Sequence, residues 1–313
     1  MTVAAAAQPT SSATMFSPRW IADHLSRWPL HIAVIGLTAA WMVPTIGLLV
    51  SSFRPFSGQA TSGWWTAFAN PTTFTISNYT QVLSAGTTNL GQAFFNSFMI
   101  SVPATVLPVS IGAFAAYAFA WMKFPGRNGL FLALVGLLAV PLQLTFIPVL
   151  SFYVQHLHWT TNNLEATGIP GLPWVPLWLA HAGYGLPFSI YLLANFFRAL
   201  PSDLFESAEI DGAGTLTVFF RIVLPLSVPA LASLVIFQFL WVWNDLLVAL
   251  IYVGGTPSVA PLTVNLAGLT TSLGQGSNLL TAAAFFSMIV PLIVFLSLQR
   301  YFVRGILAGS VKG

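Results

Sequence analysis

Acidic side chains are scarce in this chain, and most of them lie in one passage. Only 7 of the 313 residues are Asp or Glu, and Asp203, Glu206, Glu209 and Asp211 fall within nine positions. Pro201, just before them, suits the first turn of a helix, and carboxylates near a helix N-terminus are stabilised by the helix dipole. The passage therefore predicts a short acidic helix, with apolar sequence on both sides.

The sequence lacks the residue patterns of common enzyme sites. It has no phosphate-binding loop of the form G-x-x-x-x-G-K-[ST], because neither lysine, Lys123 or Lys312, follows such glycines. It has no cysteine, and its five histidines form no clear metal-binding set. No nucleophile motif stands out. We therefore expect a chain that is not an enzyme, that has no ATPase site of its own and that binds no cofactor or metal.

The composition indicates that the elements around these residues lie in a membrane. The chain is 56% hydrophobic and 5% charged, whereas a soluble domain carries about 25% charged residues. The net charge of +3 does not indicate nucleic acid as a partner, because the ten Lys and Arg residues are scattered between apolar segments and form no patch. The lipid bilayer is the expected solvent.

Six apolar stretches are long enough to cross a bilayer, which needs roughly 20 residues of helix. We therefore expect an all-α, polytopic membrane protein with six transmembrane helices. The first residues are Ala, Ser, Thr and Pro without charge, and residues 1–28 are expected to form a disordered lead-in. The six stretches are Leu30–Phe53, Gln92–Met122, Leu130–Val154, Pro173–Phe197, Ile222–Val253 and Leu280–Tyr301.

The basic residues predict the orientation of these spans. Lys and Arg concentrate in cytoplasmic loops of membrane proteins. With both termini in the cytoplasm (N-in/C-in), only Arg54 lies outside and the acidic passage lies inside. The inside segments then hold Arg19, Arg27, Lys123, Arg127, Arg198, Arg221, Arg300, Arg304 and Lys312.

The acidic passage continues into a second short helix. Leu204, Ala208 and Gly212 recur at a spacing of four, which gives one small and partly apolar ridge. Gly212 can end the first helix, and Thr215 can cap a second one. Leu224-Pro225 then opens the fifth span. The pattern predicts a helix–glycine–helix elbow outside the membrane.

This elbow resembles the EAA loop of bacterial ABC importer permeases, whose pattern is E-A-A-x-x-x-G, nine residues, then I-x-L-P. The chain has Glu206-Ser207-Ala208, Gly212 and Ile222-x-Leu224-Pro225 at the same spacing, and Asp211 precedes the glycine as in that family. Ser207 replaces an alanine, which is a change between small residues. Four further passages resemble the carbohydrate permeases similar to the smaller subunit of the maltose permease: Asn96–Phe98 ("NSF"), Ala116–Arg127 ("AYAFAWMKFPGR"), Trp241–Asp245 ("WVWND") and Tyr301–Gly313.

The resemblance implies a type I ABC importer permease fold in the bacterial cytoplasmic (inner) membrane. It implies a transmembrane permease domain over residues 29–304, a cytoplasmic coupling elbow over 200–222 and a cytoplasmic tail over 305–313. The partners that it implies are a second homologous permease in a heterodimer, two ATPase subunits that bind ATP and Mg, and an extracytoplasmic solute-binding protein contacted by residues 254–278. The residues that it assigns to ATPase coupling are Leu204, Phe205, Glu206, Ser207, Ala208, Asp211 and Gly212.

A sugar path through the membrane would need polar groups for the hydroxyls and aromatic rings for the C–H faces. Asp245 is the only acid in an expected span, and such residues are functional candidates by default. The alternative for every candidate is a hydrogen bond between helices, and for Gln143, Tyr191 and Asn195 we favour that alternative. The substrate-path candidates are Asn244, Asp245, Trp241, Gln238, Gln143, Tyr191 and Asn195.

The expected function is ATP-driven import of a sugar or oligosaccharide by alternating access, and "PLQLTFIPV" from Pro141 with "FQFLWVWNDLL" from Phe237 favours an α-glucoside. Import of glycerol-3-phosphate or another small solute is one alternative. An ion-coupled secondary transporter is another, supported only by Asp245, and internal repeats that would favour it are not evident. A membrane scaffold without transport activity would not need the elbow.

Overall fold

The computed structural model describes residues 18–84, 90–269 and 276–310, with side chains described for 28–84, 90–269 and 276–300. The described residues form helices and connecting turns without a strand, which confirms the expected all-α class. Four helices are long and apolar enough to cross a membrane, and a bent helix pair would be a fifth. The four long helices are α1 (Pro18–Ser52), α4 (Leu90–Trp121), α8 (Val175–Arg198) and α15 (Ser277–Ser310).

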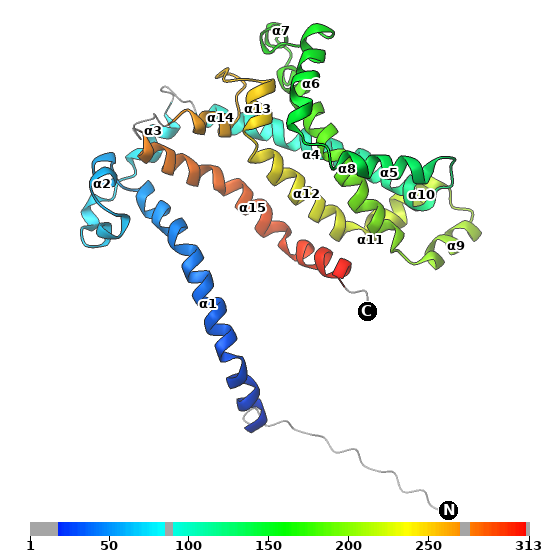
Figure 1. The fold of residues 1–313 in the computed structure, drawn as a ribbon, viewed down its shortest axis with the longest axis horizontal. Helices are drawn as coiled ribbons and strands as arrows, with labels where there is room; N and C mark the ends of the chain where they lie inside the picture. The colour runs from blue at the N-terminus through cyan, green and yellow to red at the C-terminus, as the bar shows by residue number, and fades with distance from the viewer. Residues whose placement is uncertain (1–17, 85–89, 270–275, 311–313) are drawn as a thin grey trace, which may run out of the picture.

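The body of the protein is an elongated bundle in which α4, α8, α12 (Val228–Trp243) and α15 lie alongside one another (Figure 1). The short helices α2 and α3 lie at one end of its long axis, and α9 lies at the other. The short connecting helices outside the elbow are α2 (Phe56–Thr61), η1 (Trp64–Phe68), η2 (Pro71–Thr73), α3 (Ser77–Leu83), α7 (Thr161–Ala166), η3 (Leu172–Trp174), α13 (Leu247–Tyr252) and α14 (Leu262–Ala267).

Small residues allow α4 and α8 to pack closely. A Cβ atom at Gly112 of α4 would lie 2.8 Å from the Cβ of Ser189 in α8. A Cβ atom at Gly185 of α8 would lie 2.6 Å from the amide of Gln238 in α12. Because lipid is as apolar as the helix surfaces, association in a membrane depends on such close van der Waals packing. The glycines therefore fix the spacing of α4, α8 and α12.

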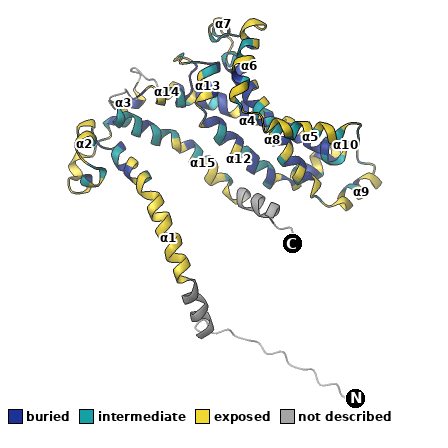
Figure 2. Ribbon diagram, viewed as in Figure 1, coloured by how far each residue is buried: buried dark blue, intermediate teal, exposed yellow. Residues whose placement is uncertain are grey.

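The first helix stands away from this bundle. Only 6% of its apolar 18-residue window is buried, against 50% for α8, and Figure 2 shows most of α1 as exposed. The helix begins at Pro18, so residues 18–28, which we expected to be disordered, are helical. Residues 1–17 and 311–313 lie outside the described residues, and α15 continues to Ser310 into the expected tail.

The third expected span, Leu130–Val154, is not one continuous helix. It is divided into α5 (Arg127–Leu137) and α6 (Gln143–Gln155), and α6 projects away from the bundle (Figure 1). Pro141 lies in the break. Proline has no N–H to donate and disfavours helical backbone in the residue before it, here Val140. Length and hydrophobicity alone did not reveal this interruption.

The fifth expected span, Ile222–Val253, is also interrupted. Helix runs from Thr215 to Leu226, bends by 75° at Ser227 and continues as α12. Pro229 follows the bend closely, and its ring conflicts with a straight helix. A second break at residues 244–246 separates α12 from α13. The sequence prediction of one long helix here is therefore wrong.

Buried hydrogen bonds join the end of α1 to α3 and α15. The Asn78 amide, 1% exposed, donates to the carbonyls of Ser52 and Arg54, each at 2.8 Å. Its oxygen accepts from the Asn278 amide at 2.7 Å. The Arg54 guanidinium is itself buried and donates to the Gly58 carbonyl at 2.7 Å. Arg54, expected as the lone basic residue outside, thus stabilises the turn that follows α1.

Candidate functional site

The acidic passage forms the helix α9 (Ser202–Ile210), as the sequence predicts. Pro201 lies one residue before the helix, and Asp203 lies in its first turn. Gly212 has φ +72°, a left-handed conformation that glycine adopts without strain. The Gly212 amide donates to the Glu209 carbonyl and the Ala213 amide donates to the Ala208 carbonyl. These two bonds form a Schellman motif, so Gly212 ends α9 as expected.

The second half of the elbow differs from the prediction. Gly214 precedes α10 (Thr215–Val218), and Thr215 is its first helical residue and not its cap. A π-helical turn, η4 (Phe219–Val223), leads directly into α11 (Leu224–Leu226). Leu224 and Pro225 therefore continue the elbow helix up to the bend at Ser227 and do not open a new span. The elbow is thus longer than residues 200–222.

Two side chains on one side of α9 attach it to the bundle. The Phe205 ring stacks on Trp121 at the end of α4, with 3.6 Å between ring centroids. The Trp121 indole N–H donates to the Phe197 carbonyl of α8 at 3.0 Å. Ala208 is buried in the same hydrophobic cluster. Of the seven expected coupling residues, Phe205 and Ala208 thus face the bundle.

The opposite side of α9 is exposed, acidic and partly apolar. Among the coupling residues, Leu204, Glu206, Ser207, Asp211 and Gly212 are exposed. Ile210 is 87% exposed and Leu216 is 65% exposed. In the part of the chain with described side chains, the four acids of this passage make no ion pair. The elbow therefore presents carboxylates and apolar side chains together at one end of the bundle (Figure 1).

The substrate-path candidates come together only in part, and their centre is a histidine of α8. The buried His181 Nε2 lies 3.7 Å from Asp245 Oδ2, and its ring meets the Trp241 ring edge-on at 5.3 Å between centroids. Among the described residues, neither ring nitrogen of His181 has a hydrogen-bond partner. Asp245 also accepts from the amides of Val248 and Ala249, and so caps α13. Asp245, Trp241 and His181 form a polar–aromatic cluster beside the α12–α13 break.

Gln238 and Asn244 lie beside this cluster with different roles. Gln238 is 4% exposed, contacts Gly185 and donates to the Ala104 carbonyl at 3.4 Å. That bond joins α12 to α4, so Gln238 makes the hydrogen bond between helices that is the alternative to a role in the substrate path. Asn244 is exposed and donates to the Leu240 carbonyl of its own helix at 2.8 Å.

The other three candidates lie apart from the cluster. Gln143 is exposed at the start of α6. The Tyr191 ring, 40% exposed, stacks with Phe131 of α5 at 6.4 Å. Asn195 is exposed and accepts from Arg198, one turn further along α8, at 3.5 Å. None of the three contacts His181 or Asp245 in the described structure.

Two functional features were missed by the sequence reading. His181 was one of five scattered histidines, and its only signal was its place inside an apolar stretch. A chain of hydroxyls was also missed: Thr145 donates to the Tyr184 hydroxyl at 3.1 Å, which lies 2.8 Å from the Tyr252 hydroxyl. It joins α6, α8 and α13. Such networks depend on tertiary contacts that spacing does not reveal.

Comparison with known proteins agrees with this architecture. A family model described as "Binding-protein-dependent transport system inner membrane component" matches residues 108–308, which include the whole elbow. The chain is 54% identical to the osmoprotective compounds uptake permease protein GgtD of Synechocystis sp., over 91% of this chain and 92% of that protein. It is 38% identical to the alpha-glucoside transport system permease protein AglG of Rhizobium meliloti, over 91% of this chain and 97% of that protein.

A solved structure shares the fold. The crystal structure of a bacterial ABC transporter involved in the import of the acidic polysaccharide alginate aligns with a TM-score of 0.64 at 17% identity, over 94% of this chain and 100% of that chain. These findings confirm the resemblance to inner-membrane permeases of carbohydrate ABC importers and a multi-pass location in the cytoplasmic membrane. The chain belongs to the family of binding-protein-dependent transport system inner membrane components.

Proposed function

We propose that this chain is a transmembrane subunit of an ATP-driven importer that moves a sugar or oligosaccharide by alternating access. The observation that carries the proposal is α9, an acidic helix anchored by Phe205 and Ala208 and otherwise exposed, inside the matched family segment. Alternating access is an exchange between two packings of the bundle, biased by ligands. Glycerol-3-phosphate import and ion-coupled transport are not favoured by the relatives.

The exposed side of α9 is the proposed contact with an ATPase subunit. Partner interfaces commonly combine apolar anchors with a charged rim, and Ile210, Leu216 and the four acids offer that combination. The stack of Phe205 on Trp121 would transmit a displacement of α9 to α4 and α8. ATP and Mg would be bound by two such partner subunits and not by this chain.

Six spans with both termini in the cytoplasm remain our proposal for the topology. It counts α5 with α6 as one interrupted span and the bent helix from Thr215 to Tyr252 as another. The chain has no cysteine, so Ile210→Cys and Ile76→Cys each introduce a single thiol at an exposed position. A membrane-impermeant maleimide added to intact cells should label Ile76→Cys alone. Labelling of Ile210→Cys without permeabilisation would refute the orientation.

The proposed substrate contact is the cluster of His181, Asp245 and Trp241. It offers an imidazole whose nitrogens make no hydrogen bond in the described structure, a carboxylate and an indole edge, which suit hydroxyls and the C–H face of a sugar. An α-glucoside is the specific candidate, since one relative carries that name. Osmoprotective compounds are a second candidate, since the 54% identical relative takes up such compounds. Uptake of labelled maltose and of labelled glycine betaine, measured in parallel, separates the two: uptake of glycine betaine without uptake of maltose would exclude the sugar.

The remaining proposed partners are a solute-binding protein and a second, homologous permease. One structural neighbour was solved with a substrate-bound periplasmic protein, at a TM-score of 0.62 and 16% identity. The exposed apolar length of α1 is consistent with a second permease or lipid around it. Purification of the tagged chain from its native host tests this set: recovery of the chain alone, with transport intact, would contradict it.

A further inference from the structure

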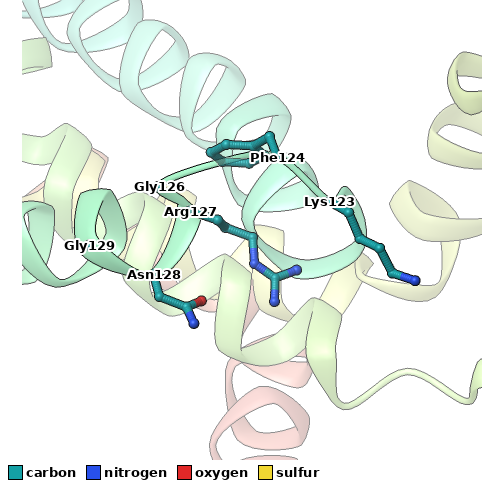
Figure 3. A pocket seen from close by; sticks show the side chains of 6 residues that line it. All are labelled: Lys123, Phe124, Gly126, Arg127, Asn128 and Gly129. Carbon is teal, nitrogen blue, oxygen red and sulfur yellow. The ribbon is translucent and has the colours of Figure 1, made fainter.

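The loop between α4 and α5 forms a cavity that is open to the surface. Its volume is approximately 330 Å³. Figure 3 shows Lys123 and Arg127 extending to the same side of the loop, while Phe124 turns to the other side. The residues that line the cavity are Lys123, Phe124, Gly126, Arg127, Asn128 and Gly129.

The charge at this cavity is positive and not neutralised by the protein. Among the described side chains, no carboxylate lies within ion-pair distance of Lys123 or Arg127. Arg127 donates to the Met122 carbonyl at 3.1 Å, which holds its guanidinium beside the loop. A guanidinium and an ammonium that line one open cavity favour an anion with several oxygens.

The base of the cavity is held in place by packing. The Arg198 guanidinium of α8 lies 4.3 Å from the centre of the Phe131 ring, and it donates to the Phe119 carbonyl at 3.4 Å. Phe119 in turn contacts both Phe131 and Phe124, at 5.4 and 5.8 Å between ring centroids. This cluster fixes the α4–α5 hairpin, so a ligand would meet a formed site and not have to order one.

The surface next to the cavity is apolar. The helix α5 begins at Arg127 and has no buried residue. Leu130, Leu132 and Leu137 are 57%, 72% and 58% exposed along it. A free inorganic anion would use only the cations, whereas a phospholipid would place its phosphate between them and its acyl chains along these leucines. The combination of a cationic cavity and an apolar flank is therefore the reason to favour a lipid.

We propose that this cavity binds the phosphate of an anionic phospholipid such as phosphatidylglycerol. Basic pockets among transmembrane helices near the cytoplasmic surface suit anionic headgroups. The stack of Trp121 on Phe205 places the loop at the same end of the bundle as α9. The leaflet, and only the leaflet, rests on the proposed function: if α9 is cytoplasmic, the lipid belongs to the inner leaflet.

Native mass spectrometry of the delipidated importer complex tests the site. The complex is titrated with phosphatidylglycerol or with phosphatidylcholine of the same acyl chains. We expect phosphatidylglycerol to bind more tightly than phosphatidylcholine. Lys123→Gln and Arg127→Gln should each bind phosphatidylglycerol about fivefold more weakly than the wild type, because each removes the attraction of one basic side chain for the anionic headgroup. Arg221→Gln removes one charge at an exposed arginine that does not line the cavity. It should bind lipid like the wild type.

Three results would overturn the proposal. They are equal retention of the two lipids, unchanged binding in both cavity variants, and retention of inorganic phosphate where phosphatidylglycerol is not retained. If the cavity variants lose the ATPase subunit while their lipid binding is unchanged, the cavity binds an acidic side chain of that subunit and not a lipid. Circular dichroism and gel-filtration elution identical to wild type exclude misfolding as the cause. Failure of the lipid test leaves transport intact, so it is distinguishable from failure of the proposed function.

Discussion

Gly212 gives the sharpest mutational test of the elbow. Its φ of +72° costs an L-residue about 1 kcal/mol or somewhat more, and an asparagine less. A Cβ atom there would meet nothing within 4 Å, so the cost of Gly212→Ala is conformational and not steric. Gly212→Pro is worse, because proline fixes φ near −65° and removes the N–H that donates to the Glu209 carbonyl. It also disfavours the near-helical backbone of Asp211.

We expect ATPase association and sugar uptake to decrease in the order wild type, Gly212→Asn, Gly212→Ala and Gly212→Pro. A cost of about 1 kcal/mol for alanine corresponds to roughly a fivefold decrease in the equilibrium constant for forming the elbow. Proline, at about 3 kcal/mol or more, should abolish coupling while membrane insertion persists. The assay is co-purification of the ATPase with the tagged chain, together with sugar uptake. Gly168→Ala, at an open position with φ +66°, is the matched control and should keep ATPase binding. Normal uptake by Gly212→Pro would refute the role of the elbow.

Five further substitutions test the packing and the substrate cluster. Gly185→Ala should lower the free energy of unfolding by about 1–3 kcal/mol, because the added methyl group collides with Gln238. Adding Gln238→Ala to the same chain should restore most of the lost stability, as measured by thermal unfolding. Asn78→Ala removes two buried hydrogen bonds and one partly buried one, and it should cost about 2–4 kcal/mol in the same measurement; an unchanged midpoint would contradict the network. Asp245→Ala should reduce uptake at least tenfold and Trp241→Phe less, with ATPase association unchanged; full uptake by both would exclude the cluster from the path.

The sequence predicted the elements whose signals are local. The acidic run, Pro201 and Gly212 all lie within a few residues of one another, and the helix and its glycine end were placed correctly from them. The four long helices also carry their signal locally, as unbroken apolar sequence. The all-α class followed from these two kinds of pattern, and the family followed from the resemblance of the elbow and four further passages to known permeases.

The errors arose where one residue changes the backbone direction. Pro141 and Pro229 lie inside expected spans, and the sequence alone did not decide between tolerance and bending at either one; helices break or bend beside both. Whether a membrane proline bends a helix depends on which neighbours satisfy the freed carbonyls, and this is set by packing. The position of the candidate site could not be predicted for the same reason, because Trp241 and Asp245 meet His181 from 60 and 64 residues further along the chain. The packing of the Phe205 side chain towards the bundle likewise depends on Trp121, which lies in a different helix.

Site-directed crosslinking at Ile210 tests the central claim most directly. The cysteine-free chain allows Ile210→Cys to carry the only thiol, at a side chain that is 87% exposed on α9. A heterobifunctional maleimide–photoreactive probe attached there should crosslink to the ATPase subunit in the assembled complex, with a yield that changes between the ATP-bound and nucleotide-free states. The same probe at Ile76→Cys should not reach that subunit. Absence of the ATPase from the Ile210 adducts in an active complex would contradict the account.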